Sequence, residues 1–345
     1  MLMQVRQPTL DTASPSLVDP FGRAVSYLRL SVTDRCNLRC VYCMSEDMRF
    51  YARPDVLGTD ALTRIARAFV ARGVRKIRIT GGEPLVRKDI MGLFEALSSE
   101  LRTGRLAELT LTTNGTRLAQ HADGLVRCGV RRVNVSLDTL DVARFAEITR
   151  GGRLADVLAG LDAAQAVGLQ VKLNVVALQG STLAEVHQLI AFAHGRGMDL
   201  SFIETMPLGD TGEDRSAQYL GLDVLRREIA SRWTLSALSD DTGGPARYAR
   251  VAQTGGRIGF ITPFTHNFCD SCNRVRVTAT GELFTCLGHD NGVSLQAALD
   301  DDPQDRRLHA AIDQAIARKP QGHQFELASR GVPVQLVRHM SLTGG

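Results

Sequence analysis

Cys36-Asn37-Leu38-Arg39-Cys40-Val41-Tyr42-Cys43 places three cysteines on one short segment, directly after the strand-like run 27–32. Three thiolates this close in sequence can face one metal centre, and soft sulfur ligands select zinc, copper(I) or iron–sulfur clusters. The next cysteine is Cys128, so no fourth thiolate lies nearby and an open metal position is indicated. The gaps also differ from ferredoxin spacings, in which four cysteines hold the cluster. On this spacing alone, a structural zinc site remains an alternative.

The bulk composition is that of an ordinary globular protein. Of 345 residues, 44% are hydrophobic and 23% charged, and no apolar run approaches the roughly 20 residues that span a bilayer. The N-terminus has no secretory apolar core, so we expect a cytoplasmic protein without membrane contact, and seven cysteines then indicate metal or redox ligands rather than disulfides. A net charge of +4 is too mild to predict nucleic-acid binding.

A strand-then-helix rhythm predicts the fold. Six strand-like runs alternate with segments of helical period, at 26–32, 75–80, 108–113, 131–137, 170–177 and 200–206. Alternating βα units form parallel sheets with right-handed crossovers, and six units are too few for a closed eight-stranded barrel. We therefore expect a flexible tail over residues 1–20, a partial, about six-unit βα TIM-type barrel over 21–207, and a C-terminal α+β extension over 208–345.

The six strands share one pattern of alternation. Apolar residues occupy one phase, while the other phase is unusually polar and includes Arg29, Ser31, Lys76, Arg78, Thr110, Thr112, Asn134, Ser136, Lys172 and Asn174. Successive strand residues point to opposite faces of a sheet, so the helices need the apolar face and the polar face lines a cavity. In barrels of this class the site lies at the carboxyl ends of the strands. The alternative is a polar sheet face exposed to solvent.

Three loops at strand ends add weaker signals. Gly81-Gly82-Glu83-Pro84 follows the second strand, and consecutive glycines permit close backbone approach. Thr113-Asn114-Gly115 and Ser136-Leu137-Asp138 are placed similarly after the third and fourth strands. Each of the three is also compatible with ordinary turn chemistry.

A second cysteine group lies in the C-terminal region. Cys269-Asp270-Ser271-Cys272 is followed after thirteen residues by Cys286, and the hairpin pattern around Thr280-Gly281 would return Cys286 to Cys272. The group again stops at three thiolates, although His266 or His289 could complete a zinc site. The remaining cysteine, Cys128, is expected to be a small buried residue.

From about Phe21 to Gly345, the chain resembles the GTP 3′,8-cyclase family, also known as molybdenum cofactor biosynthesis protein A, within the radical S-adenosylmethionine (SAM) superfamily. The resemblance covers the runs 28–36, 76–84, 111–115 and 133–138, and the terminal Gly344-Gly345. The pairing of the Cys-x3-Cys-x2-Cys and Cys-x2-Cys-x13-Cys spacings distinguishes this family from other radical SAM enzymes.

The resemblance implies cofactors and site residues. Cys36, Cys40 and Cys43 would hold one [4Fe–4S] cluster, and Cys269, Cys272 and Cys286 a second whose free iron contacts the guanine of GTP. SAM would be surrounded by Tyr42, Gly82, Ser136 and Met206. The implied GTP-binding residues are Arg29, Lys76, Arg78, Thr112, Lys172, Arg274 and Arg276, of which Arg274 and Arg276 also count as catalytic, together with the cysteines of the first group.

The resemblance also implies the reaction and the partners. The enzyme would be a lyase that converts GTP to (8S)-3′,8-cyclo-7,8-dihydroguanosine 5′-triphosphate, an early step of molybdopterin biosynthesis. A 5′-deoxyadenosyl radical would abstract the ribose C3′ hydrogen, and the resulting carbon radical would attack C8 of guanine. A one-electron reductant, a homodimer and the downstream cyclic pyranopterin monophosphate synthase, linked through its substrate, are the implied partners.

Two positions depart from the family pattern. Ser201 stands where relatives commonly have arginine, and the residues before Gly344 differ from the usual ending.

Two other functions remain as alternatives. A peptide-modifying radical SAM maturase usually carries more than three C-terminal cysteines, and a zinc-dependent protein binding RNA or another polyanion would need fourth ligands and exposed aromatic residues.

Overall fold

In a computed structural model of the protein, the described residues are 16–206, 208–209, 211–239, 243–299, 302, 304–323, 325 and 338–344. All six predicted strands are present and pair in parallel in chain order. They are β1 (Tyr27–Ser31), β2 (Lys76–Thr80), β3 (Glu108–Thr113), β4 (Arg132–Ser136), β5 (Gln170–Ala177) and β6 (Asp199–Glu204).

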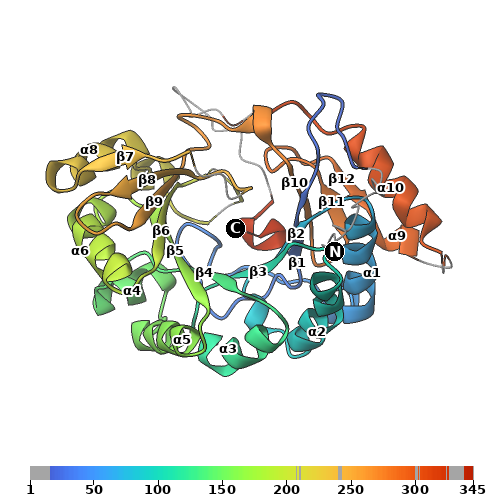
Figure 1. Ribbon diagram of the computed structural model, residues 1–345, viewed down its shortest axis with the longest axis horizontal. Helices are drawn as coiled ribbons and strands as arrows, with labels where there is room; N and C mark the ends of the chain where they lie inside the picture. Colours follow the sequence, from blue (N-terminus) through green and yellow to red (C-terminus); the bar gives the residue numbers. More distant parts are fainter. Residues whose placement is uncertain are drawn as a thin grey trace, which may run out of the picture.

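The helices between these strands cover the outside of the curved sheet (Figure 1). They are α1 (Thr59–Ala71), α2 (Ile90–Arg102), α3 (Leu118–Arg127), α4 (Val142–Thr149), α5 (Leu154–Ala166) and α6 (Thr182–Gly195). Gly73 and Gly168 follow α1 and α5 with φ of 91° and 80°, a conformation that glycine adopts without steric cost. The apolar strand phase, including Leu28 and Ile77, is fully buried in the core against these helices.

The C-terminal region extends the same sheet at both edges. β9 (Arg257–Ile261) pairs in parallel with β6, and β10 (Arg274–Val277) pairs in parallel with β1. The parallel part therefore has two more strands than the six predicted, one on each side. The remaining strands are antiparallel additions, namely β7 (Leu235–Ala237), β8 (Arg247–Val251), β11 (Glu282–Phe284) and β12 (Gly292–Ser294).

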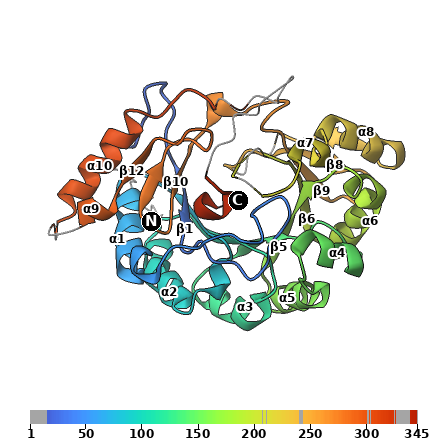
Figure 2. The same ribbon diagram turned by 180° about the vertical axis from the view of Figure 1, so that it is seen from behind.

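β12 and β7 are the two ends of this sheet of twelve strands, so the barrel stays open (Figures 1 and 2). The predicted partial barrel is confirmed. The other helices are α7 (Arg215–Gln218), α8 (Leu222–Arg232), α9 (Gln296–Leu299), α10 (Arg306–Ile316), α11 (Met340–Thr343) and the 3-10 turns η1 (Arg53–Asp55), η2 (Pro84–Val86) and η3 (Cys269–Ser271).

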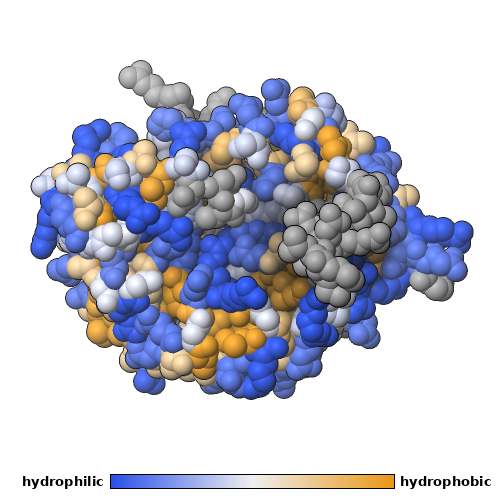
Figure 3. Space-filling view, in the orientation of Figure 1, coloured by the Kyte–Doolittle hydropathy of each residue, from blue (hydrophilic) through white to orange (hydrophobic). Residues whose placement is uncertain are grey.

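The predicted polar phase forms rows across the inner face of the sheet. Arg29 on β1 pairs in register with Arg276 on β10 and with Arg78 on β2. Further round, Asn134 pairs with both Thr112 and Lys172. Hydrophilic residues also cover much of the outer rim drawn in Figure 3. The barrel thus has apolar contacts between sheet and helices and a polar interior.

The part of the expected tail that the structure describes, residues 16–20, is attached to the body of the protein. Residues 1–15 of the expected tail lie outside the described residues. Within the rest, Leu17 is buried and donates its N–H to the Arg72 carbonyl. The Leu17 carbonyl accepts the Val25 N–H, next to an antiparallel bridge between Val18 and Ala24. No helix of the described part of the chain is long and apolar enough to cross a membrane.

Candidate active site

A cavity of about 250 Å³ opens at the carboxyl ends of the parallel strands. Both cysteine groups line it, although more than 200 residues separate them in sequence. β10 explains how both groups reach one cavity: its parallel pairing sets Arg274 beside Tyr27, so Cys272 lies at the amino end of this strand pair, whereas the first group follows the carboxyl end of β1. The cavity extends between the two groups. The last described helix, α11 (Met340–Thr343), also lies at the centre of the open barrel (Figures 1 and 2).

The first cysteine loop leaves β1 and folds across the barrel mouth. The Sγ of Cys36 accepts the Leu38 N–H at 3.4 Å and the Asn114 side-chain amide at 3.7 Å. Burial raises the pKa of Cys36, and burial together with the neighbouring Cys43 raises the pKa of Cys40 well above the usual value. Three half-buried thiols on one loop thus line the cavity, a setting suited to binding a metal centre.

Gly81 and Gly82 let two backbone segments touch at the end of β2. The Gly82 N–H donates to the Thr33 carbonyl at 2.8 Å. A Cβ on Gly81 would collide with the Thr33 carbonyl, and one on Gly82 with the carbonyls of Arg35 and Asp34. These contacts hold the glycine pair against the residues that lead into Cys36, so glycine is required by steric contact as well as by turn geometry.

Glu83 turns away from the cavity and supports its wall. Its fully buried carboxylate accepts the N–H of Leu85 at 3.0 Å, the Thr113 hydroxyl at 2.7 Å and the N–H of Asn114 at 2.6 Å. Burial raises the pKa of Glu83 to about 7 even though these donors oppose the shift. Through these bonds, the loop after β2 and the loop after β3 form one rigid unit.

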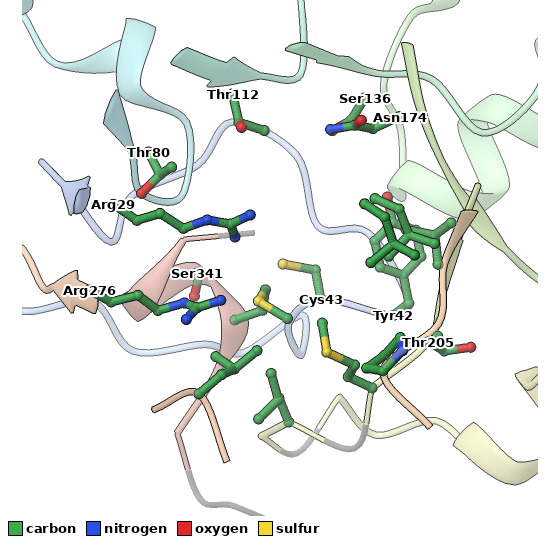
Figure 4. Close-up of a pocket in the computed structure, with 18 of the residues that line it drawn as sticks. Arg29, Tyr42, Cys43, Thr80, Thr112, Ser136, Asn174, Thr205, Arg276 and Ser341 are labelled. Carbon is green, nitrogen blue, oxygen red and sulfur yellow. The ribbon is translucent and has the colours of Figure 1, made fainter. Parts of the chain in front are cut away.

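Tyr42 is held by Asp138, a residue that the sequence prediction left as turn chemistry. The Tyr42 hydroxyl donates to one Asp138 carboxylate oxygen at 2.7 Å, and the other accepts the Val176 N–H at 2.8 Å. Burial raises the pKa of Asp138 to about 6. The contact links the first cysteine loop to the ends of β4 and β5, where Ser136 and Asn174 line the cavity (Figure 4).

Arg29 and Arg276 extend side by side into the cavity (Figure 4). Both are nearly fully buried, and the Nε of each has no hydrogen-bond partner. Burial and the neighbouring Arg29 and Arg274 lower the pKa of Arg276 well below its usual value. Such uncompensated buried cations are costly in the free protein and predict an anionic ligand between them.

Three of the predicted substrate residues lie outside the cavity lining, namely Lys76, Arg78 and Lys172. Lys76 forms an ion pair with Glu108 at 2.8 Å, and the Lys172 ammonium donates to the Tyr248 hydroxyl at 2.6 Å. Burial, followed by the nearby Arg78 and Arg132, lowers the pKa of Lys172 to about 7. These residues lie on the same polar sheet face as the lining arginines, and Arg78 pairs in register with Arg29.

The second cysteine group is arranged around η3 and the hairpin of β10 and β11. A guanidinium nitrogen of Arg274 lies 3.9 Å from the Sγ of Cys272. Burial alone would raise the pKa of the Cys272 thiol. The positive charges of Arg274 and Lys319 have a larger combined effect and lower this pKa to about 7. His289 bonds instead to the Gly322 carbonyl at 2.9 Å.

Within the described ranges, no three His, Cys, Asp or Glu side chains are grouped closely enough to hold a single metal ion. A cluster of several irons spreads its thiolate ligands over separate metal atoms, so wider spacing suits it. The two sets of three thiols therefore fit iron–sulfur clusters better than closed zinc sites.

The C-terminal helix α11 closes part of the cavity. Ser341 lines it, and Gly344 lies so close to Thr80 at the end of β2 that an added Cβ would collide with that side chain. Gly345 is outside the described residues. Ser201, the departure on β6, is fully buried, and its hydroxyl has no hydrogen-bond partner.

Several lining residues were not singled out as candidates from the sequence. These are Thr80, Asn174, Thr205, Phe268 and Ser341. Asn174 could have been found, because it shares the polar phase of β5 with Lys172 and pairs in register with Ser136. Phe268 precedes the short turn η3 and Ser341 lies in the short helix α11, and the positions of both depend on tertiary contacts.

Comparison with known proteins decides the family. The Radical SAM superfamily model matches residues 30–193, and the Molybdenum Cofactor Synthesis C model matches residues 198–325. The chain is 55% identical over 349 residues to "GTP 3′,8-cyclase" of Rhizobium etli, covering 99% of this chain and 100% of the relative. The chain belongs to the GTP 3′,8-cyclase family.

Other GTP 3′,8-cyclase relatives agree. Identity is 56% to proteins of that name from Rhizobium meliloti, over 97% of this chain and 96% of the relative, and from Rhodopseudomonas palustris, over 97% of both. Among solved structures, Streptococcus suis SuiB bound to S-adenosylmethionine matches with a TM-score of 0.60 and 17% identity, over 93% of this chain and 78% of SuiB. That likeness establishes the shared radical SAM fold.

Proposed function

We propose that the protein is a GTP 3′,8-cyclase that converts GTP to (8S)-3′,8-cyclo-7,8-dihydroguanosine 5′-triphosphate in molybdenum cofactor biosynthesis. Membership of the family supports the reaction. The structural observation that carries the proposal is a single cavity lined by two groups of three cysteines and by the buried guanidinium groups of Arg29 and Arg276, whose Nε atoms have no hydrogen-bond partner.

Cys36, Cys40 and Cys43 would hold the first [4Fe–4S] cluster, as expected of a radical SAM enzyme. Tyr42, Gly82, Ser136 and Met206 all line the cavity near this loop and are the proposed SAM contacts. When bound, the cluster and SAM supply a carbon-centred radical that removes the ribose C3′ hydrogen. The protein positions the reactants for this step, since Gly82 is locked against Arg35 and Tyr42 is locked against Asp138.

Cys269, Cys272 and Cys286 would hold a second [4Fe–4S] cluster that faces the guanine of GTP. The three cysteines line the cavity on the side opened by β10, with Arg274 and Arg276 on the same strand. Residues two apart on a strand share a face, so both guanidinium groups serve the same ligand. Both cysteine groups therefore reach one substrate in a single cavity.

Arginine and lysine residues of the polar sheet face would bind the triphosphate. Arg29, Arg274 and Arg276 line the cavity, and Thr112 adds a buried hydroxyl without a partner. Guanidinium groups suit phosphate oxygens because they donate two hydrogen bonds in one plane. Lys76, Arg78 and Lys172 lie outside the cavity lining, and we propose that they contribute mainly through their positive charge.

The two alternative functions fit less well. A peptide-modifying radical SAM maturase usually carries more than three C-terminal cysteines, whereas the second group here stops at three. A zinc-dependent polyanion-binding protein would need a fourth ligand at each site.

By family resemblance, the protein also accepts electrons from a one-electron donor, forms a homodimer and passes its product toward cyclic pyranopterin monophosphate synthase.

Metal content after anaerobic reconstitution tests the proposal. We expect about eight irons and eight sulfides per chain, four of each for each cluster, and an electron paramagnetic resonance (EPR) signal that changes when GTP is added. Cys272→Ala should reduce the content to about four irons and abolish the response to GTP, whereas the control Cys128→Ala should change neither. Zinc without iron, or four irons in the wild type, would contradict the two-cluster enzyme.

A further inference from the structure

A buried ion network lies beneath the second cysteine group. The Asp19 carboxylate accepts from the Arg23 guanidinium at 2.6 Å and forms an ion pair with the Lys319 ammonium at 3.1 Å. Its other oxygen accepts the N–H groups of Phe21 and Arg23 at 3.0 Å each. The side chains of Asp19 and Lys319 are 0% and 2% exposed, so water does not screen their charges.

The two cations of the network bind the backbone of the cysteine loop directly. The Arg23 guanidinium donates to the Cys269 carbonyl at 2.6 Å, and the Lys319 ammonium donates to the Cys272 carbonyl at 3.1 Å. Cys269 and Cys272 begin and end the short turn around η3. One cation is therefore fixed at each end of the turn that presents two of the three thiols.

The same network holds the segment after α10 under this turn. Arg23 also donates to the carbonyls of Gln321 and Pro320, at 2.6 and 2.7 Å. Gly322 lies against Cys269, and its carbonyl accepts a hydrogen bond from the His289 ring. His289 in turn lies three residues after Cys286. Three segments distant in sequence, 19–23, 269–272 and 319–322, are thus joined around one carboxylate.

Asp19 and Arg23 precede residues 30–193, the part of the chain that matches the Radical SAM superfamily model. They also lie within or next to the stretch expected from sequence to be a flexible tail. Neither lines the cavity, and neither can contact a substrate there. Asp19 and Arg23 can therefore act on the site only through the Cys269–Cys272 turn.

We propose that Asp19, Arg23 and Lys319 are positioning residues of the second cluster, which fix the Cys269–Cys272 turn and set the reduction potential of the cluster through their charges. This inference rests on the second cluster of the proposed function. Groups that bond to metal ligands from outside commonly orient the ligands and tune the metal. The potential of an iron–sulfur cluster depends on nearby charge and on solvent exposure.

The signs of the charges make the proposal specific. Reduction adds an electron, so a nearby positive charge favours the reduced cluster and a nearby negative charge opposes it. Two cations and one anion leave a net positive charge beside the turn, in a region of low dielectric where it acts strongly. Removing Lys319 should lower the reduction potential, whereas neutralising Asp19 should raise it.

The test is an anaerobic redox titration of the reconstituted full-length protein, followed by EPR at the signal of each cluster. A Cys36→Ala/Cys40→Ala/Cys43→Ala chain assigns the signal of the second cluster. We expect Lys319→Met to shift the second potential downward and Asp19→Asn to shift it upward, with the first potential unchanged in both. Lys319→Arg keeps the charge and should restore the wild-type potential.

Asp305→Asn is the matched control. Arg64 donates to the Asp305 carboxylate at 2.6 Å and to the carbonyls of Leu299 and Asp302, the same pattern of bonds without any cysteine. Asn also tolerates the left-handed conformation of Asp305, whose φ is 55°. We expect this variant to leave both potentials unchanged.

Shifts of the same sign in Lys319→Met and Asp19→Asn, or no shift in either, would overturn the proposal. If Lys319→Met does not fold, a potential in Asp19→Asn equal to that of the wild type would overturn it on its own. Failure of the proposed function has a different outcome, because the wild type would then contain only the first cluster and show no second signal.

Discussion

Gly344 lies directly against Thr80, the last residue of β2, so the described C-terminus ends beside the glycine pair that borders the first cysteine loop. Gly344 has a φ of 76°, and no side chain could be added to it without colliding with Thr80. The neighbouring Thr343 is 1% exposed. The chain end is thus a structural part of the cavity wall.

Replacing Gly344 should impair catalysis without unfolding the protein. In Gly344→Ala, the new Cβ would meet Thr80, and a residue other than glycine at this φ costs about 1–3 kcal/mol. We expect GTP turnover to fall about tenfold or more, because the end of the chain is displaced from the cavity, while the protein stays folded and its melting temperature decreases by only a few degrees. Anaerobic product formation and thermal unfolding would measure the two effects.

Gly195→Ala is the control, since Gly195 ends α6 and a Cβ there meets open space. Wild-type turnover in Gly344→Ala would mean that the close contact with Thr80 has no role in the reaction.

Removing Arg276 should weaken GTP binding and leave the free protein at least as stable. The Arg276 guanidinium is buried opposite Arg29 without a hydrogen bond at Nε, so in the free protein it is repelled more than it is stabilised. Its charged hydrogen bonds to phosphate are worth about 1.5–3 kcal/mol, so Arg276→Met should raise the Kd for GTP about 10- to 100-fold.

Equilibrium binding of GTP and urea unfolding of the free protein would test both parts of this prediction. Arg250→Met, which changes an exposed arginine of β8, should alter neither. Strong destabilisation of the free Arg276→Met protein with unchanged affinity for GTP would contradict a substrate role.

GTP binding should take up a proton at mildly alkaline pH. The pKa of Lys172 is lowered to about 7, so this amine is mostly neutral at pH 8 in the free protein. A nearby triphosphate would favour the ammonium form, so the affinity for GTP should fall as the pH rises above about 7. Calorimetry in two buffers of different ionisation enthalpy should detect up to about one proton at pH 8.

Lys172→Met should abolish this uptake. If the wild type takes up no proton, the triphosphate does not reach Lys172, in keeping with its place outside the cavity lining.

Asp138 should make the stability depend on pH. Its folded pKa of about 6 exceeds the ordinary value of 3.8, so the native state binds more protons between these values. The contribution of this group to stability is complete below about pH 4 and is lost as the pH rises through 6, by roughly 3 kcal/mol. Asp138→Asn should lack this loss and become more stable relative to the wild type over that range.

Urea unfolding at several pH values would measure the difference, with Asp223→Asn as the exposed control. A parallel pH dependence in Asp138→Asn and the wild type would contradict the assignment.

The sequence allowed prediction of what depends on local pattern. The six strands, their polar phase and the two cysteine groups follow from periodicity and spacing, because burial and side-chain direction repeat every two residues along a strand. The placement of β9 and β10 at opposite edges of the barrel could not be predicted, since it depends on pairing across long loops. The contact of Lys172 with Tyr248 and the attachment of Asp19 also depend on such tertiary contacts.

Transfer of deuterium tests the central claim most directly. The protein, reconstituted anaerobically, would be incubated with SAM, a one-electron reductant and GTP deuterated at the ribose C3′ position. The account predicts one 5′-deoxyadenosine carrying deuterium for each molecule of 3′,8-cyclised GTP formed, both measured by mass spectrometry. Formation of 5′-deoxyadenosine without deuterium, or without the cyclised nucleotide, would contradict it.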